Sequence, residues 1–101
     1  MEQAVIVHFS YGSTDFGPFF TFEEKLENLV ERSGLGDYDG NELAVSGEDG
    51  YLWMYGPDAD KLYEAVLPLL RATKFMHGAE VRLRYGPPED GVKEVEVVVE
   101  P

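Results

Sequence analysis

Apolar residues occur at every second position, or in short continuous runs, along five segments of the chain, which is the pattern of β-strands. The five segments are residues 4–9, 42–46, 51–55, 80–85 and 92–99. The first of them is apolar on both faces, and we therefore expect it to lie at the centre of a sheet. The other four alternate, so each should bury only one of its faces.

Two further segments repeat apolar residues every three or four positions, the spacing of an amphipathic helix. We predict that the first helix begins at Thr21, because Thr21 and Glu24 have the spacing of a capping box. It should end at Gly34, which tolerates the left-handed conformation. The second helix should begin after Asp58, a predicted N-cap. Its interior contains Pro68, and we expect a kink or an early end there because an interior proline costs ~3 kcal/mol.

Turn-forming residues separate these elements. Gly12, Gly17 and Pro18 predict a loop between the first strand and the first helix. The segment 35–40 predicts a turn after that helix. The run Glu48-Asp49-Gly50 predicts a tight hairpin before the third strand.

The predicted order of elements is βαββαβ, followed by one more strand at the C-terminus. Over nearly the whole chain this arrangement resembles the ferredoxin-like split βαβ fold of the α+β class. The resemblance implies one domain spanning residues 1–101, with an antiparallel sheet of strand order 4-1-3-2 and both helices on one face. We expect the fifth strand to pair with the fourth at the edge of the sheet. The segments 55–60 and 39–42 are also similar to small bacterial proteins of unassigned function, a resemblance that implies no activity.

The chain is strongly acidic, with 20 acidic and eight basic residues and a formal charge of −12. Residues 1–60 alone carry 13 acidic residues and two basic ones. This charge disfavours nucleic acids and anionic membranes as partners, because both repel such a protein. It is compatible with a well-solvated surface or with electrostatic capture of a basic protein.

The lack of cysteine fits a reducing compartment, and we expect a cytoplasmic protein. No apolar run approaches the roughly 18 residues of a membrane-spanning helix. The acidic first residues do not have the pattern of a signal peptide.

A possible calcium loop is the most specific metal motif in the chain. Asp37, Asp39, Asn41 and Glu48 match its positions 1, 3, 5 and 12. Glu42 occupies the sixth position, where the sharp turn of such a loop needs glycine. We therefore expect a solvated turn, with no bound metal and no cofactor.

His8 is the candidate for chemistry on the central strand. Catalysis by His8 would need a nucleophile or a second base within reach. Ser10 lies on the same face, and Ser13 and Asp15 follow in the next loop. We favour a structural or interface role for His8. The alternative is a small-molecule sensor or an enzyme, whose site would lie between His8 and the loop 13–20. The phenylalanines of that loop would form a lid or close one end of the core.

The strand phases also predict what lies on the sheet face away from the helices. If Leu52 and Met54 face the helices, this outer face carries Tyr51, Trp53, Tyr55, Ile6 and His8, bordered by Arg82 and Arg84. Tryptophan, tyrosine and arginine are enriched in interface hot spots. We therefore predict a non-enzymatic interaction domain. It would be a homodimer through this face, or an antidote-type binder of a basic toxin or nuclease. The alternative is that this face is not an interface, because the C-terminal strand or the loops cover it or because the strand phase is wrong by one residue.

Overall fold

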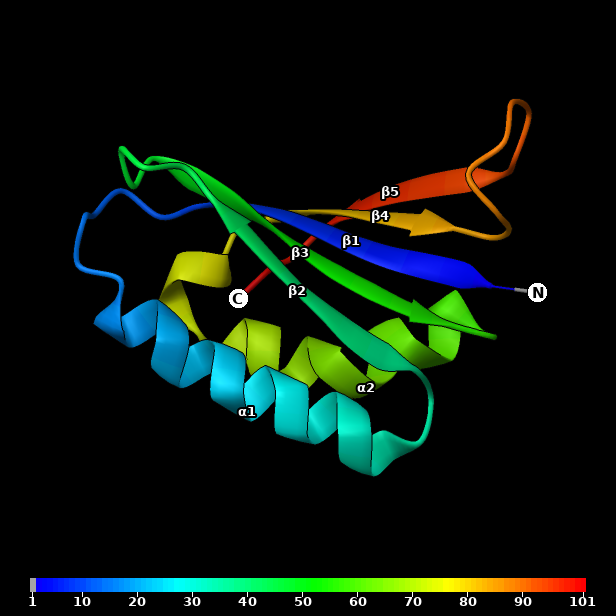
Figure 1. The fold of residues 1–101 in the computed structure, drawn as a ribbon, viewed down its shortest axis with the longest axis horizontal. Coiled ribbons are helices and arrows are strands. Elements are labelled where there is room, and N and C mark those ends of the chain that lie inside the picture. Colours follow the sequence, from blue (N-terminus) through cyan, green and yellow to red (C-terminus); the bar gives the residue numbers. More distant parts are fainter. Residues whose placement is uncertain (1) are drawn as a thin grey trace.

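The computed structural model describes residues 2–101, which form a five-stranded antiparallel sheet with two helices on one of its faces (Figure 1). The elements in chain order are β1 (Gln3–Ser10), α1 (Gly17–Ser33), β2 (Asp37–Leu43), β3 (Asp49–Gly56), α2 (Ala59–Ala72), the short 3-10 helix η1 (Lys74–Met76), β4 (Glu80–Arg84) and β5 (Glu94–Val98). The strands lie in the order β2-β3-β1-β4-β5. This is the ferredoxin-like βαββαβ arrangement with an extra strand, and β5 pairs with β4 at the edge as predicted.

The core lies between the helices and the inner face of the sheet. Val5 on β1 has Met54 and Leu83 as its neighbours on the two adjacent strands. All three side chains are buried. The helices contribute the opposite side of the core, with Phe19, Phe22, Leu26, Val30, Leu62, Val66 and Leu70. The predicted phases of β1, β3 and β4 are therefore correct, because a shift of one residue would have exchanged the two faces.

Helix α1 begins one turn before the predicted start, so the predicted capping box is wrong. The N-cap is Phe16, which makes no side-chain cap, and Pro18 lies in the first turn. Proline is well suited to that position because the first N–H groups of a helix have no intrahelical acceptor. Instead, the hydroxyl of Thr21 donates a hydrogen bond to the carbonyl oxygen of Gly17, with the two oxygens 3.2 Å apart. The extra turn buries Phe19 completely, and this burial outweighs the local capping preference.

Strand β2 and the hairpin after it also differ from the prediction. The segment 37–40 is strand rather than turn, and the chain turns at residues 44–48 instead of at Glu48-Asp49-Gly50. The early start pairs Asp37 with Tyr55 and Tyr38 with Met54 of β3, and the register shifts at a bulge between Tyr38 and Gly40. Gly47 occupies the left-handed region in the turn, with φ at 76°.

Helix α2 confirms the predicted N-cap and excludes one of the two outcomes predicted at Pro68, an early end. The carboxylate of Asp58 accepts a hydrogen bond from the backbone N–H of Lys61, at 3.1 Å, and so caps the helix. The helix does not end at Pro68 but continues to Ala72. Pro68 and Glu64 are both exposed, and the proline leaves the carbonyl of Glu64 without its helical donor. The buried stripe through Leu70 holds the last turn in place.

Candidate interaction face

The sheet face opposite the helices carries the outward residues predicted from the strand phases. Figure 1 shows both helices on one side of the sheet, and β5 extends the sheet instead of folding across the other side. Ile6 lies between Trp53 on β3 and Arg82 on β4. In the same way, His8 lies between Tyr51 on β3 and Glu80 on β4. The face is therefore open along β1, β3 and β4 within residues 2–101.

Three rings on this face form one continuous stack. The imidazole of His8 lies over the ring of Tyr51, with centroids 4.4 Å apart and planes 16° apart. The ring of Tyr51 in turn lies 5.6 Å from that of Trp53, at 21°. We call His8, Tyr51 and Trp53 the aromatic stack. All three residues are half-buried, because each ring covers part of the next.

Two carboxylates hold the ring of His8 at the end of this stack. Its Nε2 lies 2.7 Å from Oδ2 of Asp49, and its Nδ1 lies 3.4 Å from Oε1 of Glu80. Both ring nitrogens can donate only when the imidazole is protonated. The hydrogen bond to Asp49 is the main cause that raises the pKa of His8 above its ordinary value; Glu80 adds to the increase, and partial burial opposes it.

Asp49 is a residue of this face that the sequence pattern does not predict, because the run Glu48-Asp49-Gly50 favours a hairpin turn. The structure places it on β3, directly opposite Ser10 of β1. It extends the alternation of the outward residues Tyr51 and Trp53 by one step. This alternation could have predicted that Asp49 faces outward, but the turn-forming residues Glu48-Asp49-Gly50 favoured a hairpin at this position instead.

Two of the predicted face residues are largely inaccessible. Ile6 is 7% exposed and Arg84 is 8% exposed. The guanidinium of Arg84 lies 6.0 Å from the centroid of the Tyr55 ring, and its Nε donates to the carbonyl of Gly86 at 2.7 Å. Arg84 thus fixes the end of β4, and the accessible groups are the aromatic stack, Tyr55 and Arg82.

Carboxylates surround these groups on both sides. On the β2 side, Asp37 is aligned with Tyr55 and Glu42 with Tyr51. On the opposite side lie Glu80 of β4 and Glu94 and Glu96 of β5, and Asp49 of β3 lies at the end of the stack, beside His8. We call these six residues the acidic border. Arg82, the accessible arginine of the face, forms an ion pair with Glu94 at 3.2 Å, so the face is predominantly negative.

A hollow of about 140 Å³ lies beside His8, where the predicted alternative site would begin. Its lining consists of sheet residues: Ile6, His8, Tyr51, Glu80, Arg82 and Glu96. Asp15 does not line it. The carboxylate of Asp15 accepts the N–H of Gly17 at 3.0 Å, within its own loop.

The phenylalanines of the loop 13–20 have separate roles. Phe19 is buried and stacks on Phe9 of β1, with centroids 5.5 Å apart. Phe16 stacks on Tyr11 at 5.9 Å. Phe20 is 53% exposed. Phe19 therefore closes one end of the core, which is one of the two roles predicted for the phenylalanines of this loop. Phe20 lies outside the core.

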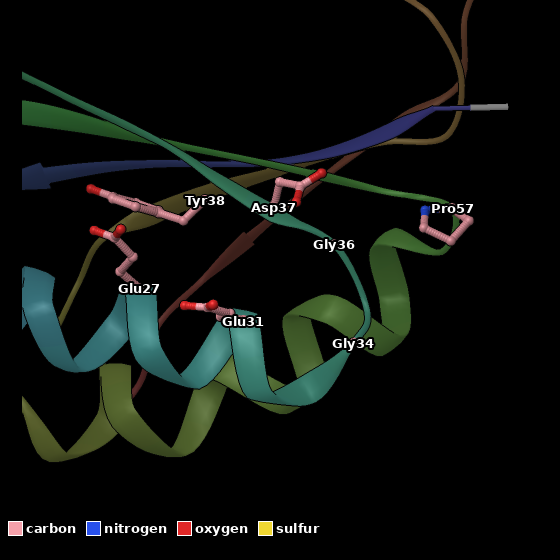
Figure 2. Close-up of a pocket in the computed structure, with 7 residues that line it drawn as sticks. All are labelled: Glu27, Glu31, Gly34, Gly36, Asp37, Tyr38 and Pro57. Carbon is pink, nitrogen blue, oxygen red and sulfur yellow. The ribbon is translucent and has the colours of Figure 1, made fainter.

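A second acidic region lies on the helix side of the sheet. A groove of about 540 Å³ separates the end of α1 from the start of β2 (Figure 2), and it is lined by Glu27, Glu31, Gly34, Gly36, Asp37, Tyr38 and Pro57. Figure 2 shows Glu27 and Glu31 extending from α1 into the space beneath β2. Burial is the main cause that strongly raises the pKa of Tyr38, and the hydrogen bond that its hydroxyl donates to Glu23 adds to the increase.

The predicted metal-loop residues do not form a loop. Asp37, Asp39 and Asn41 belong to strand β2, and the amide of Asn41 donates to Glu23 at 2.6 Å. They were expected in a solvated turn, so this assignment is corrected. No group of three or more His, Cys, Asp and Glu side chains suited to a metal ion occurs in residues 2–101.

Comparison with known proteins does not connect the chain to a characterised relative. No family model, no curated protein and no solved structure matches it. Within residues 2–101 no helix has the length and apolar character needed to cross a membrane. The ferredoxin-like fold occurs with many functions, so a function has to be argued from the surface.

Proposed function

We propose that the protein is a non-enzymatic interaction domain that binds a basic surface of another protein through its open sheet face. The observation that carries this proposal is the position of the aromatic stack between two lines of carboxylates. A lysine or arginine side chain of the partner would lie against the face of Trp53 or Tyr51 in a cation–π contact. Neighbouring members of the acidic border would accept its N–H groups.

The charge of the whole chain supports a basic partner. A formal charge of −12 on 101 residues attracts a cationic protein before contact and accelerates association. This attraction is screened over about 8 Å at physiological salt, so the aromatic contacts must contribute to the bound state. A basic toxin or nuclease masked by an antidote-type protein is one such pair. We propose the cytoplasm as its location, because the chain has no cysteine.

A second copy of the chain is the other protein that this face would accept. In a homodimer through the face, the acidic border of one copy would lie against that of its mate. Like charges brought together in this way oppose binding. A basic partner removes that repulsion, and we therefore rank it above the homodimer. A small-molecule site beside His8 ranks below both, because the hollow there is about 140 Å³, less than the roughly 300 Å³ at which ligand pockets begin.

The direct test uses Trp53, which is the single tryptophan of the chain. A labelled octalysine peptide is titrated into the protein, and both its anisotropy and the emission of Trp53 are recorded. We expect saturable binding that changes the emission of Trp53 and weakens with added salt.

Two double variants with the same change in charge show where the peptide binds. Glu42→Gln with Glu96→Gln removes two charges from the face, whereas Glu27→Gln with Glu31→Gln removes two from the groove of Figure 2. The face variant should weaken binding by about tenfold and the groove variant by much less. Equal losses would contradict the proposal, because they would mean non-specific attraction. Light scattering on the unliganded protein would identify a homodimer instead.

A further inference from the structure

The two edges of the sheet differ in how they are protected. The β2 edge contains the bulge between Tyr38 and Gly40 and carries Asp37, Asp39 and Glu42. Bulges and charged side chains are the usual means of preventing an edge strand from pairing with another chain. Strand β5 also carries charged residues, Glu94 and Glu96, but it has no bulge and no proline, and its five residues pair in continuous register with β4.

The free backbone groups of β5 follow from its pairing. Tyr85 donates its N–H to the carbonyl of Lys93 at 3.0 Å, and Val99 donates to Ala79 at 2.9 Å. Hydrogen-bonded and non-hydrogen-bonded pairs alternate in an antiparallel ladder, so the odd-numbered residues between Lys93 and Val99 also bond to β4. The even-numbered residues Glu94, Glu96 and Val98 therefore direct their N–H and C=O groups away from the sheet. All three are exposed.

The side chains of β5 define what a neighbouring strand would need. Glu94 and Glu96 lie on the outer face, and Val95 and Val97 lie on the inner face. Val95 is 38% exposed and Val98 is 56% exposed, which are high values for large apolar side chains in this protein. Glu96 forms no ion pair within residues 2–101, since Arg82 pairs with Glu94. The strand thus presents an unpaired carboxylate and exposed apolar surface beside free backbone groups.

Strand β4, which already pairs with one edge of β5, shows which kind of sequence pairs with β5. Arg82 lies opposite Glu96 and Arg84 opposite Glu94 on the outer face, while Leu83 lies opposite Val95 on the inner face. Arginine therefore alternates with apolar residues in the strand that β5 already binds. Opposite charges facing each other across two strands stabilise their pairing, and like charges destabilise it.

We propose that the free edge of β5 binds an extended segment of another protein in which arginine or lysine alternates with apolar residues. The segment would add an antiparallel sixth strand to the sheet. Its backbone would bond to Glu94, Glu96 and Val98, and its basic side chains would lie beside Glu94 and Glu96. Two β5 strands of the same protein would instead bring these glutamates together, so charge disfavours a second copy. The proposal does not depend on the aromatic stack, because the contacts are made by β5.

The test uses a hexapeptide that alternates arginine and valine, with a glutamate–valine peptide as its counterpart. Amide hydrogen exchange is followed residue by residue in the full-length protein by NMR. The basic peptide should slow exchange at Glu94, Glu96 and Val98 by about tenfold, as expected for amides that enter a ladder. The acidic peptide should not. Two further versions of the basic peptide are methylated on alternate backbone nitrogens, one on the odd-numbered residues and one on the even-numbered residues. Only one of the two versions should lose the protection of the β5 amides, because only one set of peptide N–H groups faces β5.

Charge variants then test the recognition by side chains. Glu96→Lys should weaken the basic peptide by about tenfold and strengthen the acidic one, whereas Glu89→Lys makes the same change in charge in the loop between β4 and β5 and should have little effect. Unchanged exchange at the three β5 amides would overturn the proposal, as would protection that rises with protein concentration without peptide. Binding that is lost in Trp53→Ala, with no protection at β5, would place the peptide on the aromatic stack. That result would support the proposed function while overturning this inference.

Discussion

Nε2 of His8 lies 2.7 Å from Oδ2 of Asp49, a residue 41 positions away in the chain. The two side chains meet because β1 and β3 are antiparallel neighbours, with His8 aligned to Tyr51 and Ser10 aligned to Asp49. The imidazole is therefore held between a carboxylate on one side and the phenol ring of Tyr51 beneath it. This contact connects the acidic border to the aromatic stack.

The contact should make the stability of the protein depend on pH. The folded state raises the pKa of His8, chiefly through Asp49. A group of this kind stabilises the fold fully below its unfolded pKa of ~6.5, and the contribution is lost as pH rises through the folded value. The melting temperature of the wild type should therefore exceed that of His8→Gln at about pH 5.5, and the difference should shrink by about pH 9.

An Asp49→Asn variant gives the control for this dependence, because it retains the shape of the side chain and removes its charge. Its stability should vary less with pH over the same range than that of the wild type. Thermal unfolding followed by circular dichroism measures all three proteins. A difference between wild type and His8→Gln that grows toward alkaline pH would contradict the assignment.

The opposite orientations of Leu52 and Trp53 predict different effects on stability. Leu52 is fully buried against the helices, and its replacement by alanine should cost about 2–5 kcal/mol. Trp53 lies half-buried on the open face, so Trp53→Ala should cost about 1 kcal/mol, the scale of its ring contacts. Urea unfolding measures both. A loss for Trp53→Ala as large as that for Leu52→Ala would mean that the outer face is covered.

The turn between β2 and β3 predicts a strong position-specific effect at Gly47. A Cβ there would lie 2.0 Å from the carbonyl oxygen of Ser13, and φ is already 76°. Gly91 has a similar φ of 82° but nothing within 4 Å of its Cβ position. Gly91→Ala should therefore cost about 1–2 kcal/mol from the backbone conformation alone, and Gly47→Ala should cost clearly more. Equal losses in urea unfolding would show that the loop at Ser13 moves away freely.

The aromatic face should not bind nucleic acid. Its rings would be able to stack on bases, but the acidic border and the charge of −12 oppose the approach of a polyanion. We expect no change in the anisotropy of labelled single-stranded DNA or RNA at physiological salt. Saturable binding that weakens with added salt would show that Arg82 outweighs the surrounding carboxylates.

The sequence by itself determined the order of the elements and the two faces of the strands. Alternation in a strand has a period of two residues, so the positions of Leu52 and Trp53 follow from the local pattern wherever the strand lies. The cap at Asp58 is equally local, because its carboxylate reaches a backbone N–H only three residues away. These features do not depend on which strand is the neighbour.

The tertiary structure alone decided the ends of the elements and the contacts between strands. Helix α1 gains its first turn because Phe19 packs on Phe9, and β2 starts early because β3 supplies its hydrogen-bonding partner. The pairing of His8 with Asp49 and the burial of Arg84 arise in the same way. Such contacts join residues far apart in the chain, and their free energy exceeds the local preferences of capping and turn residues. The local pattern therefore predicts which face a side chain occupies, while the sheet register decides which groups it meets there.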